Sequence, residues 1–124
     1  TRSDLLYKRS PDIRSKILHC FLSAPTFLDL EVNSRKFHLV HGFPSEHEND
    51  RLWGRPDPNA EPPIPDVTVI VGHTPTSLLT GEEKAPMRIW HGNGMIDIDC
   101  GCAGRSAFSR LACIRLDDMQ EFYV

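Results

Sequence analysis

Apolar residues recur with a helical period near the start of the chain and with strand-like periods after it. Between residues 11 and 23 they return every three or four positions, which predicts an amphipathic helix. Ser10 is a typical N-cap and Pro11 suits the first turn, while Ala24-Pro25 ends the pattern. The apolar face of this predicted helix is formed by Ile13, Ile17, Leu18, Phe21 and Leu22.

The rest of the pattern predicts short strands. Residues 27–32 and 36–40 flank Asn33-Ser34-Arg35, so we expect them to form a β-hairpin. Residues 67–71 are nearly all apolar and β-branched, which is typical of a strand buried on both faces. One helix followed by many strands favours a mixed or antiparallel sheet over a doubly wound one. We also expect one helical turn at 76–79, and strands at 87–90, 95–98, 111–116 and 121–124, the last two paired.

A long polar stretch between His41 and Asp66 interrupts the strand pattern. The stretch is rich in proline, and loops of this length inside a compact domain are usually functional or disordered. Trp53 within it indicates that part of the loop packs against another element.

Length, charge and cysteine usage narrow the class of protein. The 124 residues suffice for one domain, and a formal charge of -3 gives no support for binding to nucleic acid or to a membrane surface. No apolar run approaches the length of a membrane span. The cysteines lack paired C-x-x-C spacing, and Cys100-Gly101-Cys102 is too cramped for an ordinary disulfide. We therefore expect a reducing, cytoplasmic location.

Two histidines, His41 and His73, each follow an apolar strand-like run and lie beside a glycine. Strand ends position side chains rigidly, and imidazole nitrogens are common ligands of transition metals. A single histidine in such a place is more often a hydrogen-bonded structural residue, but two in the same context favour a metal site. The remaining histidines have simpler interpretations, namely a sheet-facing structural role for His38, exposed surface for His19 and His47, and a turn role for His91.

A catalytic metal site needs at least one further ligand and an open position. Asp97 and Asp99 are candidates because they lie at alternate positions of one strand, although turn capping is the simpler interpretation of Asp99. Arg55, in the long loop, is a candidate for phosphate binding because a guanidinium can bind two oxygens at once. A zinc site at Cys100 and Cys102 is disfavoured, since these thiols are closer in sequence than zinc ligands usually are.

Five short motifs span most of the chain: LVHG at 39–42, LWGR at 52–55, VIVGHTP at 69–75, IDIDCG at 96–101 and LACIRL at 111–116. In this order they resemble the C-terminal half of calcineurin-like metallophosphoesterases. Within that family, the resemblance is to the bacterial serine/threonine phosphatases and the symmetrical diadenosine tetraphosphatases.

The resemblance implies a metal-dependent phosphoesterase with an α/β fold, a four-layer α/β/β/α sandwich of which this chain supplies a mostly mixed β-sheet and one helix. It implies that His41 and His73 bind one ion of a two-metal centre and that Arg55 contacts the substrate phosphate. Two divalent ions, manganese, iron or zinc, would activate a bridging hydroxide for in-line attack on phosphorus. The substrate would be a phosphoprotein, a dinucleotide polyphosphate or a small phosphoester.

The family's N-terminal motifs G-D-x-H, G-D-x-x-D-R-G and G-N-H-[ED] do not occur in this sequence. In the family they supply most of the metal ligands and the general-acid histidine. We therefore expect residues 1–124 to be the C-terminal part of one metallophosphoesterase domain, inactive without its N-terminal half as a partner. The alternative is a non-catalytic interaction module with structural histidines, whose proline-rich loop binds another protein.

Overall fold

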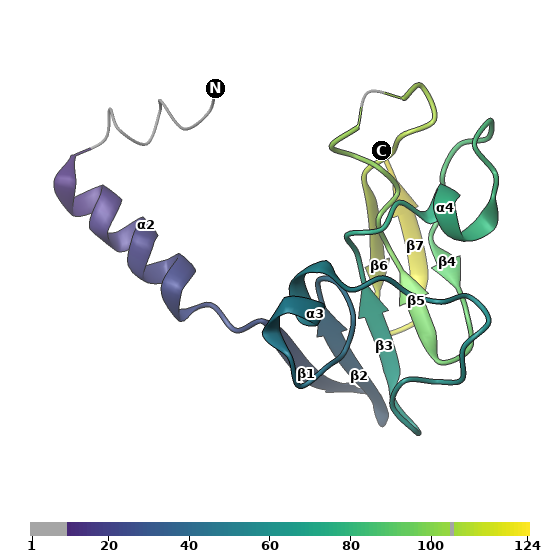
Figure 1. The fold of residues 1–124 in the computed structure, drawn as a ribbon, viewed down its shortest axis with the longest axis horizontal. Helices are drawn as coiled ribbons and strands as arrows, with labels where there is room; N and C mark the ends of the chain where they lie inside the picture. Colours follow the sequence, from purple (N-terminus) through teal and green to yellow (C-terminus); the bar gives the residue numbers. More distant parts are fainter. Residues whose placement is uncertain (1–9, 105) are drawn as a thin grey trace.

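The largest element of the protein is a five-stranded mixed β-sheet with a separate two-stranded hairpin beside it (Figure 1). The computed structural model describes residues 10–104 and 106–124. In the sheet, the strand order is β1-β2-β3-β5-β4; β2, β3 and β5 are parallel, and both edge strands are antiparallel to their neighbours. This arrangement confirms the α/β class and the mixed sheet. The strands are β1 (Phe27–Val32), β2 (Arg35–Val40), β3 (Thr68–Val71), β4 (Trp90–His91) and β5 (Met95–Asp97), with β6 (Ala112–Arg115) and β7 (Gln120–Tyr123) in the hairpin.

Asn33 and Ser34 turn β1 back onto β2. Both residues have positive φ, 50° and 61°, as required by the two-residue turn that best matches the twist of a hairpin. Val32 pairs with Arg35 to close the ladder. The predicted hairpin is therefore confirmed, with Arg35 in the strand instead of the turn. The turn is also tied to the second hairpin, because the Asn33 side-chain amide donates to the Asp117 carbonyl (3.1 Å).

β3 lies at the centre of the sheet, between two parallel neighbours. Val69, Ile70 and Val71 are 0%, 5% and 1% exposed, which confirms the expected strand buried on both faces. Because β2 and β3 are parallel, their carboxyl ends reach the same edge of the sheet. The residues that follow these two strands are thereby placed side by side.

β4 is shorter than the sequence predicts. The expected strand at 87–90 pairs only at its last residue, because backbone N–H groups before that point have other partners. The Met87 N–H donates to the Phe108 carbonyl (2.9 Å), and the Ile89 N–H donates to the Tyr123 hydroxyl (3.1 Å). These bonds hold the segment against the C-terminal part of the chain instead of against β5.

The sheet buries an apolar cluster on each face, because successive side chains of a strand point to opposite sides. The second hairpin packs against one cluster, which is formed by Phe37, Ile70, Ile89, Ile96 and Cys100. Loop side chains pack against the other cluster, which is formed by Val40, Val69, Val71 and Met95.

The predicted first helix is present as α2 (Pro11–Ser23). The Ser10 hydroxyl accepts a hydrogen bond from the Ile13 N–H (3.4 Å), which confirms the predicted N-cap. The helix projects away from both sheets (Figure 1) and buries none of its residues. Its apolar face is open to solvent, with exposed fractions of 58% at Leu18, 75% at Phe21 and 78% at Leu22.

Within residues 10–104 and 106–124, two shorter helices follow α2. α4 (Thr76–Thr80) confirms the predicted turn at 76–79. α3 (Glu48–Trp53) lies in the long polar stretch, where no apolar period predicts a helix. The expectation of one helix and a single helical turn at 76–79 therefore missed α3. Among the described residues, no helix is both long enough and apolar enough to cross a membrane.

Candidate metal site at the sheet edge

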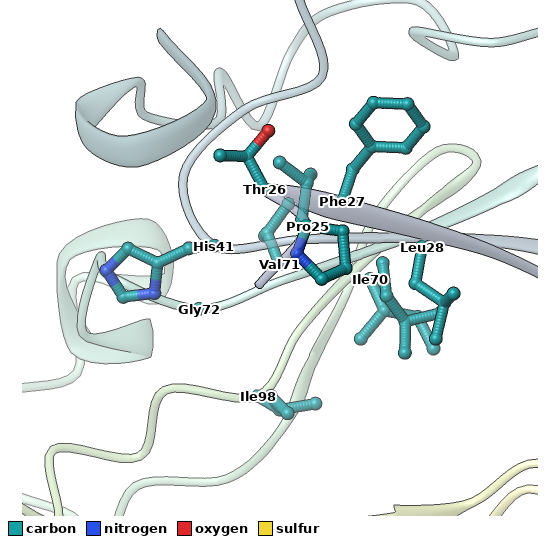
Figure 2. Close-up of a pocket in the computed structure, with 11 residues that line it drawn as sticks. Pro25, Thr26, Phe27, Leu28, His41, Ile70, Val71, Gly72 and Ile98 are labelled. Atoms are coloured by element: carbon teal, nitrogen blue, oxygen red, sulfur yellow. The ribbon is translucent and has the colours of Figure 1, made fainter. Parts of the chain in front are cut away.

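His41 and His73 come together at the carboxyl end of the sheet. The Gly72 N–H donates to the His41 carbonyl (3.0 Å), which extends the contact between β2 and β3 beyond the strands themselves. The two imidazole ring centroids are 5.0 Å apart, with an interplanar angle of 65°. Figure 2 shows the His41 ring pointing away from the apolar side chains beside it. The parallel strands therefore place two potential metal ligands next to each other.

His73 is held in an uncommon backbone conformation. Its φ is +67°, and the Thr74 N–H donates across it to the Gly72 carbonyl (2.7 Å). A hydrogen bond between residues two apart around a positive φ defines the rarer and more strained form of the γ-turn. Such strain costs of order 1–3 kcal/mol and is found mostly at functional sites.

Close backbone packing holds α3 against the residues that follow His41. The Gly42 N–H donates to the Arg51 carbonyl (2.7 Å), and the Phe43 N–H donates to the Asp50 carbonyl (3.0 Å). A Cβ on Gly42 would lie 2.8 Å from the Asp50 carbonyl oxygen and 2.9 Å from the Gly54 nitrogen. Glycine is required at this position because backbone atoms occupy the space of a side chain.

The docked helix brings Trp53 to the histidine pair. Its ring centroid lies 5.3 Å from that of His73, with an interplanar angle of 80°. This confirms that part of the loop packs against another element, although the sequence did not place Trp53 in the site. The only sequence signal was an aromatic residue within a polar stretch. Trp53 remains 63% exposed, so its ring borders the site without closing it.

Arg55, the predicted phosphate-binding residue, lies two positions after Trp53 and is exposed. It follows the C-terminus of α3, where Gly54 N–H donates to the Asp50 carbonyl (2.8 Å). The docked segment therefore carries both Trp53, whose ring contacts His73, and Arg55, whose side chain is exposed to solvent.

The two aspartates differ in their surroundings. The Asp99 carboxylate accepts the Gly101 N–H (2.9 Å), which confirms the turn-capping interpretation. Asp97 is 0% exposed. Burial raises the pKa of its carboxyl to about 7, against the lowering effect of the Asp99 N–H and with a further rise from the Asp99 carboxylate. Neither residue joins the histidine pair in a cluster, since the described residues contain no group of three or more potential metal ligands.

The remaining histidines have structural partners or face solvent. His38 is buried and its Nδ1 lies 2.7 Å from the Asp29 carboxylate, as expected of a structural residue. His19 and His47 are exposed, as predicted. His91 differs from the predicted turn role, because it ends β4 and its Nε2 lies 2.6 Å from the Glu121 carboxylate.

An apolar pocket of about 390 Å³ adjoins His41 (Figure 2). His41 is the one ionisable residue of its lining, and most of the other lining side chains are apolar. The side chains that form it include Pro25, Leu28, Leu39, Ile70 and Ile98.

Comparison with known proteins leaves this geometry as the main guide to function. No protein-family model matches the chain, and no curated protein matches it.

Proposed function

We propose that this chain supplies one side of the metal centre of a calcineurin-like phosphoesterase. His41 and His73 bind one divalent ion, and Arg55 contacts a phosphate oxygen of the substrate. The motif order and the placement of the two histidines at neighbouring strand ends support this assignment.

The separation of the two imidazole rings carries the proposal. With metal–nitrogen bonds of about 2.0 to 2.1 Å and tetrahedral angles, two imidazoles on one ion have ring centres roughly 5 Å apart. The His41 and His73 centroids are 5.0 Å apart. The ring separation is therefore the one expected for two imidazoles on a shared ion of the imidazole-binding type, such as zinc, iron or manganese.

Two histidines form only part of a catalytic centre, which takes at least three protein ligands. We assign the remaining ligands of a two-metal centre to the N-terminal half of the domain that the motif order implies. Bound divalent ions would supply Lewis-acid chemistry for hydrolysis of a phosphate ester. The residues of this chain orient one ion and the phosphate. We place the protein in the cytoplasm, in keeping with its four free cysteines.

Zinc binding by the isolated chain tests the proposal. We expect Zn²⁺ to perturb the side-chain resonances of His41 and His73 together in an NMR titration. His41→Ala and His73→Ala should each weaken binding at least about tenfold, because each removes one of two ligands. His19→Ala is the matched control, since that imidazole is exposed on α2. Equal Zn²⁺ affinity in all three variants would remove the histidine pair from the site.

One observation favours a second candidate, a non-catalytic interaction module. The apolar face of α2 is exposed and the helix buries none of its residues, as expected of a segment that docks on another protein. This candidate predicts that Zn²⁺ binding is no stronger at the histidine pair than at the exposed histidines. The same titration therefore separates the two functions.

A further inference from the structure

Residues 72–76, which include His73, form an arch. The two ends of this arch, its feet, are hydrogen-bonded to residues 98 and 99, which directly follow β5. One foot of the arch is fixed because the Ile98 N–H donates to the Val71 carbonyl (3.0 Å). The other foot is fixed because the Thr76 N–H donates to the Asp99 carbonyl (2.9 Å). His73 lies between the two feet, at the strained γ-turn.

Asp97 lies at the first foot of this arch, where it is the register partner of Val71. Its side chain is completely buried. The other two residues of β5, Met95 and Ile96, are also buried, and both are apolar. A strand position without a polar role is normally filled by such a residue. A fully buried carboxyl group is therefore unexpected at this strand position.

Two hydrogen bonds in series connect the Asp97 carboxyl to the second foot of the arch. The Asp99 N–H donates to Asp97 Oδ1 (2.9 Å), and the Asp99 carbonyl accepts from the Thr76 N–H (2.9 Å). Thr76 is 1% exposed and Asp97 is 0% exposed, so this connection lies in the interior of the protein. A buried carboxyl that accepts a backbone N–H fixes the turn around it, because that N–H would otherwise be left unpaired.

We infer that Asp97 is a positioning residue that fixes the second foot of the arch through the Asp99 backbone and so holds His73 in place for metal binding. The inference rests on the proposed function for the metal-binding part and on the arch geometry for the rest. Asp97 touches neither metal nor substrate in this role. It acts on His73 in the way that groups behind a metal ligand orient that ligand.

Two substitutions of Asp97 separate a positioning role from a general effect on stability. Asp97→Asn keeps the shape and the hydrogen-bonding groups, whereas Asp97→Val keeps a strand-forming side chain but removes the polar atoms. Val69→Ala is the control, because Val69 is equally buried in the adjacent strand and lies outside the arch. Asp97→Ala, which removes the same polar atoms with less bulk, provides a second test if Asp97→Val does not fold.

Two measurements are made on each folded variant, the Zn²⁺ affinity of the histidine pair and the Cα and Cβ chemical shifts of His73, which report its φ. Asp97→Val should weaken Zn²⁺ binding by about tenfold or more and move the His73 shifts toward those of an ordinary φ. Asp97→Asn should stay close to the wild type in both. Val69→Ala should unfold more easily with both readouts unchanged.

The outcomes distinguish this inference from the proposed function. A folded Asp97→Val or Asp97→Ala variant with wild-type affinity and wild-type His73 shifts would overturn the role of Asp97 and leave the metal site standing. If the wild-type chain itself does not bind Zn²⁺ at His41 and His73, the metal site is lost. The His73 shifts then decide alone whether Asp97 fixes the arch.

Discussion

A pair of glycine substitutions tests whether backbone packing behind His41 sets the geometry of the site. Gly42→Ala places a Cβ 2.8 Å from the Asp50 carbonyl oxygen and 2.9 Å from the Gly54 nitrogen. Both are backbone atoms of α3 and its C-cap, so neither can rotate away. Gly72→Ala meets only the His41 carbonyl oxygen, at 3.9 Å, which is ordinary contact, and Gly72 has no left-handed φ. The two substitutions add the same methyl group to neighbouring strand ends.

The two variants are expected to change stability in opposite directions. Overpacking against rigid atoms costs about 1 to 3 kcal/mol, so Gly42→Ala should destabilise the fold by that amount. Gly72→Ala should stabilise it by about 0.4 to 1 kcal/mol, because alanine restricts the unfolded chain at a compatible position. The difference in unfolding free energy between the variants is then roughly 1.5 to 4 kcal/mol.

Urea unfolding measures this difference directly. With a slope of about 2 kcal/mol/M, the two midpoints should differ by at least roughly 0.7 M. Tryptophan fluorescence of the folded proteins adds a local readout, because displacement of α3 in Gly42→Ala moves Trp53 away from His73. Equal midpoints, or a lower midpoint for Gly72→Ala, would refute the argument that backbone contact at Gly42 docks the helix.

Three further predictions concern buried acids and the exposed helix. Burial raises the pKa of Asp97 from 3.8 to about 7, so between these pH values the folded state holds a proton that the unfolded state has released. The free energy of unfolding should therefore fall by at most about 4 kcal/mol as the pH rises from 3.8 to 7. Asp97→Asn should flatten that slope in unfolding measurements. Burial raises the pKa of Glu121, but hydrogen bonds, including one from Tyr123, lower it by more, so the pKa lies below 4.5. The stabilisation by ionised Glu121 is complete above pH 4.5 and is lost as the pH falls through the pKa of the folded state. The difference in unfolding free energy between wild type and Glu121→Gln should therefore shrink in acid. The double change Phe21→Ser and Leu22→Ser should leave the unfolding free energy of the sheet within about 0.5 kcal/mol, since α2 buries none of its residues, and a larger loss would show that the helix packs on the sheet in solution.

Local signals predicted much of the fold. Ser10 and Pro11 marked the start of α2, and residues 27–40 contained both strands and the turn of the first hairpin. The central strand was evident because its residues are apolar and β-branched. In each case the structure follows from the properties of residues adjacent in sequence.

The remaining features depend on contacts between distant segments. α3 has no apolar period and forms where its backbone docks on Gly42. The strand expected at 87–90 is shortened because the Tyr123 hydroxyl takes the Ile89 N–H. The contact of Trp53 with His73 joins two loops whose sequences do not indicate each other. The strand ends indicated His41 and His73, whereas the groups around them required the structure.

The link between the two hairpin turns has a consequence for how the protein acquires its fold. The Asn33 side chain and the Asp117 carbonyl are 84 positions apart in sequence, and Arg35 also donates to the Leu116 carbonyl across 81 positions (2.7 Å). Closing such long loops is slow, and synthesis from the N-terminus delivers β1 and β2 well before β6 and β7. During that interval the sheet face around Phe37 and Ile70 is uncovered. The second hairpin therefore acts as a late closing step of folding, and the nascent chain is most prone to aggregation just before it is made.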